Sequence, residues 1–253
     1  MKPQDGSNLY GTAGFRETFK GAPVGSGGVI VPIVLSLVPI RSVVDVGCGP
    51  AWWLAEFMAR GVTDVLGIDG NWVDPSALQI PVDQFVASDL ELSIRVGRRF
   101  DLAVCVEVAE HLPETRAAGL IHDLVDLSPC VLFSAAIPGQ GGTHHVNEQF
   151  LSYWAGHFAR HHFAPVDLIR PQIWNNENVQ YWYRQNIIIF AAAGHPILDL
   201  GPTTANDYIH PEYLRQMQSR NRPPTLGEQL SSFPRALRRS IRSRWHKAVH
   251  PRN

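Results

Sequence analysis

Val43-Val44-Asp45-Val46-Gly47-Cys48-Gly49-Pro50 is an apolar run that ends at two closely spaced glycines. A continuous run of valines is typical of a parallel strand that is covered on both faces. Gly47 and Gly49 allow the backbone to turn sharply and to pass close to a ligand that a Cβ would block. Residues 51–58 are mostly apolar and predict a helix, whose first N–H groups can bind that ligand. The stretch therefore predicts a strand, a glycine turn and a helix around a nucleotide cofactor.

A second apolar run, Val65-Leu66-Gly67-Ile68-Asp69-Gly70, ends in an acid about twenty residues after the glycine turn. A Rossmann-like site places a carboxylate on the ribose hydroxyls at this position. The turn lacks the third glycine of the dinucleotide motif, because Ala51-Trp52-Trp53 stands where that glycine would come. Asp45 would also repel a pyrophosphate and attract a cationic amino-acid ligand. These two features argue against a nicotinamide cofactor.

Several short motifs occur along the chain in a characteristic order. They are Asp45-Val46-Gly47-Cys48-Gly49, then Asp69, then Ser88-Asp89, and then Phe100-Asp101-Leu102 leading to Glu107. In this order they resemble the motifs of class I S-adenosylmethionine (SAM) methyltransferases. The resemblance implies that Asp69 holds the ribose hydroxyls of SAM and that Asp89 holds the adenine amine. The implied cofactor site comprises Asp45, Gly47, Gly49, Asp69, Gly70, Asp89 and Leu90.

A longer resemblance covers roughly residues 29–193. It rests on Glu107-Val108-Ala109-Glu110-His111-Leu112-Pro113, Phe133-Ser134-Ala135-Ala136-Ile137-Pro138-Gly139-Gln140-Gly141-Gly142, Val146-Asn147-Glu148-Gln149 and Trp182-Tyr183-Arg184-Gln185-Asn186. These segments are similar to those of a bacterial subfamily that is often linked to glycan biosynthesis. The resemblance implies a sugar or polysaccharide O-methyltransferase, with methylmannose polysaccharides among the products of this type.

The apolar segments alternate with helical patterns, as expected of a doubly wound α/β fold. Further strands are predicted at residues 85–87, 100–106, 130–135, 164–170 and 186–193, and helices at residues 113–127 and 148–161. The resemblance implies a Rossmann-like seven-stranded sheet of order 3-2-1-4-5-7-6, with strand seven antiparallel and helices on both faces.

Composition divides the chain into three parts. Residues 1–28 are polar and rich in glycine and predict an N-terminal lid or a mobile arm. Residues 29–193 form the predicted SAM-binding domain, which opens with an apolar helix at 29–40 that is too short to span a bilayer. Residues 194–253 form a C-terminal extension, with a polar helix at 211–220.

The extension ends in a basic segment without any acid. Its apolar residues recur at every fourth position: Phe233, Leu237, Ile241, Trp245 and Val249. This pattern predicts a basic amphipathic helix. Residues 233–249 could make peripheral contact with an anionic membrane, or they could dock on the parent domain or on a second subunit in a homodimer, and both alternatives stay open.

Charge and cysteine content indicate the cellular compartment of the protein and the partners that it is not expected to bind. The net charge of −1 gives no basic field that would attract nucleic acid. The first residues contain no apolar segment of a secretory signal. Cys48, Cys105 and Cys130 all fall on or beside predicted core strands, which favours reduced thiols. We therefore expect a cytoplasmic protein that does not bind nucleic acid.

Acids and histidines gather after the fourth and fifth predicted strands. Glu107, Glu110 and His111 have i, i+3, i+4 spacing, so they would share one face of a helix. A glycine-rich loop delivers His144 and His145 to the same edge of the sheet. Oxygen and imidazole ligands suit Mg²⁺ or Mn²⁺.

We assign Glu107, Glu110, His111 and His145 to a divalent metal, and His144 to the role of general base. In the alternative interpretation, the Glu-x-x-Glu-His segment packs under the cofactor without a metal, and Glu148 is an ordinary residue in the first turn of a helix.

These features predict a SAM-dependent O-methyltransferase that acts on a sugar hydroxyl of a small-molecule or oligosaccharide acceptor. A small natural product, an RNA ribose hydroxyl, or SAM binding without catalysis are the alternatives. The aromatic residues of the predicted loop 171–186 could stack on a sugar ring or could cover the sheet edge: Trp174, Tyr181, Trp182 and Tyr183.

Overall fold

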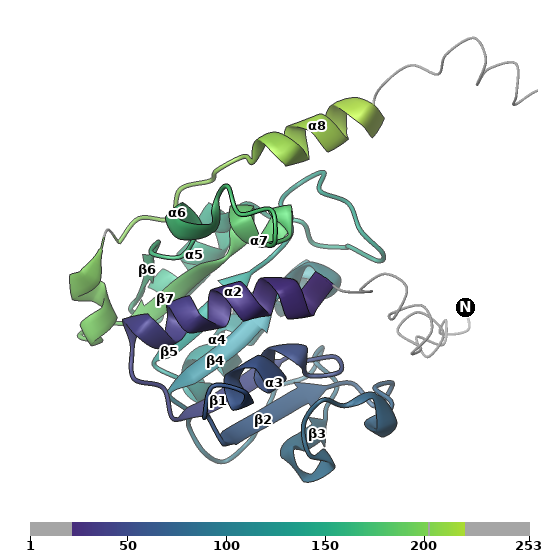
Figure 1. The fold of residues 1–253 in the computed structure, drawn as a ribbon, viewed down its shortest axis with the longest axis vertical. Helices are drawn as coiled ribbons and strands as arrows, with labels where there is room; N and C mark the ends of the chain where they lie inside the picture. The colour runs from purple at the N-terminus through teal and green to yellow at the C-terminus, as the bar shows by residue number, and fades with distance from the viewer. Residues whose placement is uncertain (1–21, 202, 221–253) are drawn as a thin grey trace, which may run out of the picture. The chain divides into compact units, whose positions relative to one another are not determined.

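The computed structural model describes residues 22–201 and 203–220. Its centre is a seven-stranded sheet of order β3-β2-β1-β4-β5-β7-β6 (Figure 1). The strands are β1 (Ser42–Val46), β2 (Asp64–Asp69), β3 (Phe85–Ala87), β4 (Leu102–Val106), β5 (Cys130–Ser134), β6 (Phe163–Val166) and β7 (Ile188–Ala192). The first five strands pair in parallel, and β7 runs antiparallel to both β5 and β6. The predicted fold and strand order are confirmed.

Helices cover both faces of the sheet. They are α2 (Ala22–Leu37), α3 (Trp52–Met58), α4 (Ala117–Leu127), α5 (Leu151–Ala159), α6 (Arg170–Ile173), α7 (Tyr181–Asn186) and α8 (Pro211–Arg220). One core cluster contains residues of α2 and α3, and the other contains residues of α4 and α5. Every residue of β4 and β5 is buried, because each lies between these two layers. The three cysteines are buried and unpaired, as their positions predicted.

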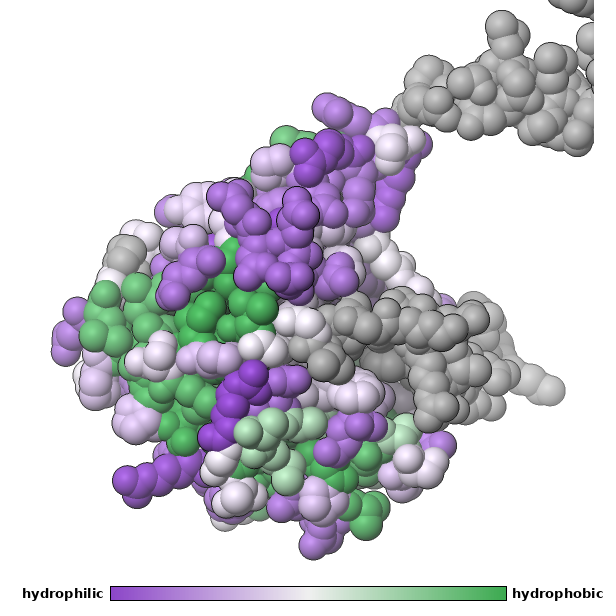
Figure 2. Space-filling view, viewed as in Figure 1, coloured by the Kyte–Doolittle hydropathy of each residue, from purple (hydrophilic) through white to green (hydrophobic). Residues whose placement is uncertain are grey.

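The helix predicted at 29–40 is present but begins earlier. α2 starts at Ala22, so residues 22–28 belong to a helix and not to the predicted arm. Ser26 is fully buried, and its hydroxyl accepts a hydrogen bond from the Gln180 amide (3.0 Å). Figure 2 shows hydrophobic residues on the side of the molecule where the C-terminal half of α2 lies. Residues 1–21, to which the lid prediction chiefly applies, lie outside the described residues.

The segment 171–186, predicted as a loop, contains α6 and α7. Tyr181 and Tyr183 are buried, with 5% of each side chain exposed. Tyr183 makes an edge contact with Trp53 (5.4 Å between ring centroids). These two rings therefore cover the core and are closed to a sugar acceptor. Trp174 and Trp182 are half-buried.

Two predicted elements are shorter than expected, because a charged side chain at one end of each makes other contacts. The strand predicted at 164–170 stops at Val166, because the Arg170 guanidinium turns inward to Asp167 (2.7 Å) and to the carbonyls of Gln185 and Asn206. The helix predicted at 148–161 begins only at Leu151. Glu148 precedes it because its carboxylate binds the glycine-rich loop instead.

The chain divides into two compact units, Met1–Tyr213 and Leu214–Asn253. Residues 195–213, predicted as part of an extension, pack within the first unit, where Ile197 is fully buried. The helix predicted at 211–220 coincides with α8. The basic segment 233–249 lies outside the described residues. Within 22–201 and 203–220, no helix is long and apolar enough to cross a membrane.

Candidate active site

The glycine turn after β1 has the left-handed backbone that only glycine adopts freely. Gly47 has φ +79° and Gly49 has φ +52°. The Gly47 amide donates a hydrogen bond to the Ile68 carbonyl (2.8 Å), so the turn is joined to the end of β2. A Cβ on Gly47 would lie 2.4 Å from a methyl group of Val108. The turn is therefore fixed both by its conformation and by close packing against the segment after β4.

Asp69 at the end of β2 supports this turn directly. Its carboxylate accepts hydrogen bonds from the amides of Gly49 (2.7 Å) and Gly70 (2.6 Å). Burial raises the pKa of Asp69, and the two backbone donors partly oppose that rise. The sequence predicted only a ribose contact for this residue. The structure adds that Asp69 shapes the backbone of the cofactor turn.

Asp45 lies inside the end of β1 with only 2% of its surface exposed. Burial first, and then the charge on Asp69, raise the pKa of Asp45 well above its usual value. Its Oδ2 atom has no hydrogen-bond partner among the residues that the structure describes. An unsatisfied buried acceptor is uncommon in proteins and indicates a missing donor.

The third predicted cofactor segment follows β3. Asp89 is exposed and accepts a hydrogen bond from the Glu91 amide (2.9 Å). Leu90 is buried, and its carbonyl accepts a hydrogen bond from Arg116 (2.8 Å). Because β3, β2 and β1 are neighbours, all seven predicted cofactor residues follow the same edge of the sheet. That edge is where open α/β sheets bind their ligands.

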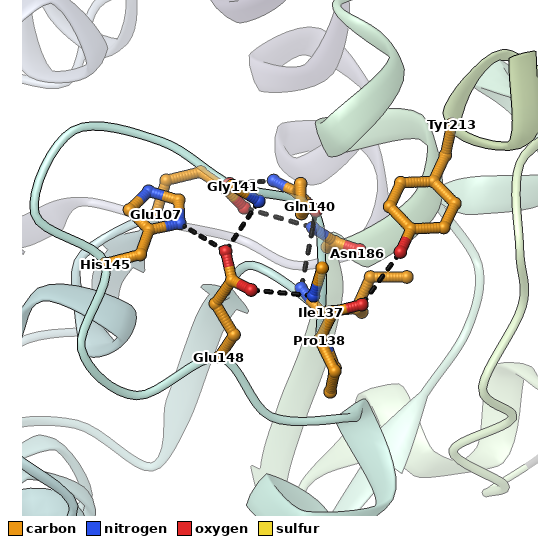
Figure 3. A network of polar contacts seen from close by, with 10 residues as sticks. Glu107, Ile137, Pro138, Gln140, Gly141, His145, Glu148, Asn186 and Tyr213 are labelled. Carbon is orange, nitrogen blue, oxygen red and sulfur yellow. Dashed lines mark hydrogen bonds and ion pairs between the residues drawn. The ribbon is translucent and has the colours of Figure 1, made fainter. Parts of the chain in front are cut away.

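Glu107 and Glu110 do not share a helical face, contrary to the prediction. Glu107 has φ +55°, and its amide donates to the Ser134 carbonyl (3.0 Å), so the chain leaves β4 in a left-handed turn. A single 3₁₀ turn, Ala109–His111, follows. The Glu107 carboxylate accepts hydrogen bonds from Gln140 (3.2 Å) and Asn186 (3.4 Å), which are close neighbours in Figure 3.

Glu110, His111 and His145 form a compact group of three. One ligand atom from each lies within 4.8 Å of the others. Glu110 is fully buried, and its carboxylate lies beside the amides of Glu110 and Ala136 and the carboxyl group of Glu107, but no contact from the described residues to either oxygen has good hydrogen-bond geometry. Burial and the Glu107 charge raise the pKa of Glu110 well above its usual value. Glu107 is not one of these three, although its carboxyl group lies beside that of Glu110.

The two histidines of the group contact each other, and this contact affects the protonation of His111. The rings of His111 and His145 meet edge to face at 4.9 Å. Burial and the neighbouring His145 lower the pKa of His111 to about 4, which keeps its imidazole neutral at neutral pH. A neutral imidazole is the form that binds a metal.

Glu148 organises the loop that carries the histidines. Its carboxylate accepts a hydrogen bond from the Gly139 amide (2.7 Å). It also accepts from the Gly141 amide (2.6 Å) and contacts His145 Nδ1 (2.9 Å), as Figure 3 shows. Sequence reasoning did not find this role. The available signal was that the segment Val146-Asn147-Glu148-Gln149 closely follows the glycine-rich segment in the sequence.

His144 stands apart from this group. Its side chain is exposed, and its backbone has φ +60°. The His144 backbone is hydrogen-bonded to the His111 ring, while its own imidazole is not part of the three-residue cluster. The structure thus gives the two adjacent histidines of the loop different surroundings.

Residues 25–168 match the family model described as "Methyltransferase domain". The chain belongs to the methyltransferase domain family. Two curated relatives are ubiquinone biosynthesis O-methyltransferases. The protein from Acinetobacter baylyi is 33% identical over 82 residues, which are 29% of this chain and 34% of the relative. The protein from Alkalilimnicola ehrlichii is 34% identical over 88 residues, which are 31% of this chain and 34% of the relative. The match spans about a third of the length of these relatives.

Solved structures share the fold of this methyltransferase. Magnesium protoporphyrin IX methyltransferase from Synechocystis PCC 6803 with bound SAH has a TM-score of 0.54 at 17% identity, and the match covers 74% of this chain and 98% of that one. The sugar N-methyltransferase KedS8 from Streptoalloteichus has a TM-score of 0.54 at 13% identity, and the match covers 70% of this chain and 91% of that one. At these identities the likeness shows the fold alone.

Buried amides connect the rim of the methyltransferase site to residues near α8. Asn186 donates to Gln140 (3.0 Å), and Gln185 donates to Asn186 (3.0 Å). Gln185 in turn accepts from the His210 amide (2.8 Å). The Tyr213 hydroxyl donates to the Pro138 carbonyl (2.7 Å) at the start of the glycine-rich loop (Figure 3). His210 and the first turn of α8 therefore support the loop.

Tyr213→Phe tests this support. The change removes one hydrogen bond and leaves the Pro138 carbonyl without that donor, so we expect the free energy of unfolding to fall by about 1 kcal/mol. Urea unfolding followed by circular dichroism measures the change. Tyr153→Phe, at a half-buried tyrosine of α5 away from this contact, is the matched control. Equal stability of the two variants would contradict the inferred support.

Proposed function

We propose that this methyltransferase transfers a methyl group from SAM to a sugar hydroxyl, with His144 as the base and a divalent metal held by Glu110, His111 and His145. The proposal rests on one observation: two sites lie next to each other at the same edge of the sheet. The cofactor turn follows β1, and the carboxylate and histidine cluster follows the neighbouring strands β4 and β5. A methyl donor at the first site would face an acceptor at the second.

The residues after β1, β2 and β3 fit SAM. The left-handed turn at Gly47 and Gly49 lets the backbone pass close to the cofactor, and Asp69 would accept from the ribose hydroxyls. Asp89 is exposed and can accept from the adenine amine. The unsatisfied Oδ2 of Asp45 suits the ammonium group of the methionine part. SAM supplies an electrophilic methyl group on a sulfonium.

The cluster fits a divalent cation. Glu110 offers two buried oxygens without a hydrogen bond from the described residues, and a dication would relieve its repulsion with Glu107. His111 and His145 would complete the protein's share of the ligands. Mixed oxygen and imidazole ligands suit Mn²⁺, and Mg²⁺ would need additional water. A bound dication lowers the pKa of vicinal hydroxyls and orients them.

His144 is the side chain that would accept the proton. The acceptor oxygen forms a bond to the methyl carbon, the carbon–sulfur bond breaks, and the hydroxyl proton passes to an imidazole nitrogen of His144. A positioned base of this kind contributes roughly 10²–10⁴ in rate. Its exposure leaves the ring accessible to an acceptor that enters from solvent.

Transfer to oxygen is supported by the two curated relatives, both of which are named as O-methyltransferases. A sugar acceptor is supported by the glycan-linked resemblance. A hydroxyl on a small apolar molecule is the second candidate. Val146 and Phe150, which flank Glu148 in the sequence, are 65% and 42% exposed and could contact such an acceptor. A panel of sugars, oligosaccharides and phenols with labelled SAM separates the two.

Asp69→Ala tests the cofactor site. Loss of hydrogen bonds to a carboxylate costs about 1.5–3 kcal/mol each, so SAM affinity should fall by roughly ten- to a hundredfold. Calorimetric titration with SAM measures the change. Asp83→Ala, at an exposed acid on the loop before β3, is the matched control and should bind normally. Unchanged affinity in a folded Asp69→Ala protein would remove the ribose assignment.

A further inference from the structure

A buried ion pair holds the segment that follows β3. Arg116 and Asp123 are 8% and 4% exposed, and they form an ion pair between the turn before α4 and the helix itself. Arg116 Nε donates to the Leu90 carbonyl (2.8 Å), and Arg116 Nη2 donates to the Leu92 carbonyl (2.7 Å). The guanidinium therefore binds two backbone carbonyls that belong to no helix or strand.

The carboxylate completes the same attachment. Asp123 Oδ2 accepts from the Ile94 amide (3.0 Å), and Asp123 Oδ1 accepts from the Ser93 hydroxyl (3.2 Å). Four points between residues 90 and 94 are thus held by two side chains of opposite charge. A buried ion pair keeps a fixed geometry when further hydrogen bonds pair the remaining donors and acceptors of its two partners.

Gly119 provides the space for this arrangement. A Cβ at this position would lie 2.5 Å from Arg116 Nη1. Glycine inside a helix is less favourable than alanine, so a glycine within α4 needs a packing reason. Room for the guanidinium is that reason. Arg116, Gly119 and Asp123 thus form one arrangement that holds residues 90–94.

We propose that these three residues, which we name the loop clamp, position residues 88–94 for the adenine of SAM. This inference rests on the proposed function, in which Asp89 contacts the adenine amine. Leu90, whose carbonyl Arg116 holds, is the next residue in the chain. The clamp residues are positioning residues, because they act on the cofactor only through this backbone.

Arg116→Lys is the first test. Lysine keeps the positive charge beside Asp123 but cannot bind two carbonyls with a planar fork. The dissociation constant and the KM for SAM should rise by about tenfold, the effect of losing one hydrogen bond to a charged group. The kcat at saturating SAM should stay within about twofold. Adenosine alone should lose affinity by the same factor as SAM, because the clamp acts on the adenine segment.

Gly119→Ala is the second test, and it retains both charged partners. The added methyl group displaces the guanidinium, so SAM affinity should fall by about threefold or more. Arg99→Lys is the matched control, because Arg99 also donates to a backbone carbonyl, that of Val125, but does not touch residues 88–94. Its SAM affinity should match the parent.

The outcomes separate the clamp from the proposed function. A parent protein that fails to bind SAM overturns both. If the parent binds SAM and Arg116→Lys and Gly119→Ala bind it equally well, the clamp alone is overturned. If Arg116→Lys does not fold, Gly119→Ala decides: a higher KM for SAM at unchanged kcat supports the clamp, and an unchanged KM overturns it.

Discussion

Removal of divalent metal is expected to abolish methyl transfer and to leave SAM affinity within about twofold of its starting value. The buried carboxylate of Glu110 lacks hydrogen bonds from the described residues, and its ligand atom lies within 4.8 Å of those of His111 and His145. A dication is the group that this set best accommodates. Turnover measured before and after chelation, and again with added Mg²⁺ or Mn²⁺, checks this expectation.

Variants locate the requirement for metal. His145→Ala should raise the metal concentration that gives half-maximal turnover by at least about tenfold, a typical cost of losing support at a metal site. Glu107→Gln should raise it by less, because Glu107 already accepts from Gln140 and Asn186. His122→Ala, at an exposed histidine paired with Asp126, is the control. Full turnover in the presence of chelator would contradict the metal site.

Loss of the His144 imidazole should lower the rate of methyl transfer by roughly 10²–10⁴, the usual contribution of a positioned base. Binding of SAM and of metal should persist, because the ring lies outside the three-residue cluster. His144→Asn is a cleaner change than His144→Ala, because asparagine tolerates the left-handed backbone at φ +60° better than alanine does. Single-turnover rates at saturating SAM measure the effect.

The alternative assignments of the base give a different result. If His144→Asn retains a rate within about threefold of the parent, the base is His145, His111 or Glu148. Glu148 is then the least suited of the three, because both its oxygens already accept hydrogen bonds from the loop amides and one of them contacts His145. His161→Ala, at a half-buried histidine in the turn after α5, controls for general effects of removing an imidazole.

The sequence by itself determined the fold and predicted which edge of the sheet holds the cofactor. The valine run, the glycines at 47 and 49 and the acids at 45 and 69 are local signals, because a strand, a left-handed turn and a helix each depend on neighbouring residues. The motif order gave the strand order 3-2-1-4-5-7-6 by resemblance, and the structure confirms it. The helix at 211–220 followed from local composition in the same way.

The tertiary structure alone decided how the acids and histidines are held. Helical spacing placed Glu107 beside Glu110, and the two carboxyl groups do lie together, but the backbone between them is not the predicted helix. The Glu107 amide bonds to the Ser134 carbonyl of β5, a strand that lies far along the chain, and the backbone at Glu107 is left-handed. The roles of Glu148 and of the Arg116 and Asp123 pair likewise come from segments that meet only after folding. Periodicity describes one segment at a time, whereas these groupings are set by hydrogen bonds between segments distant in sequence.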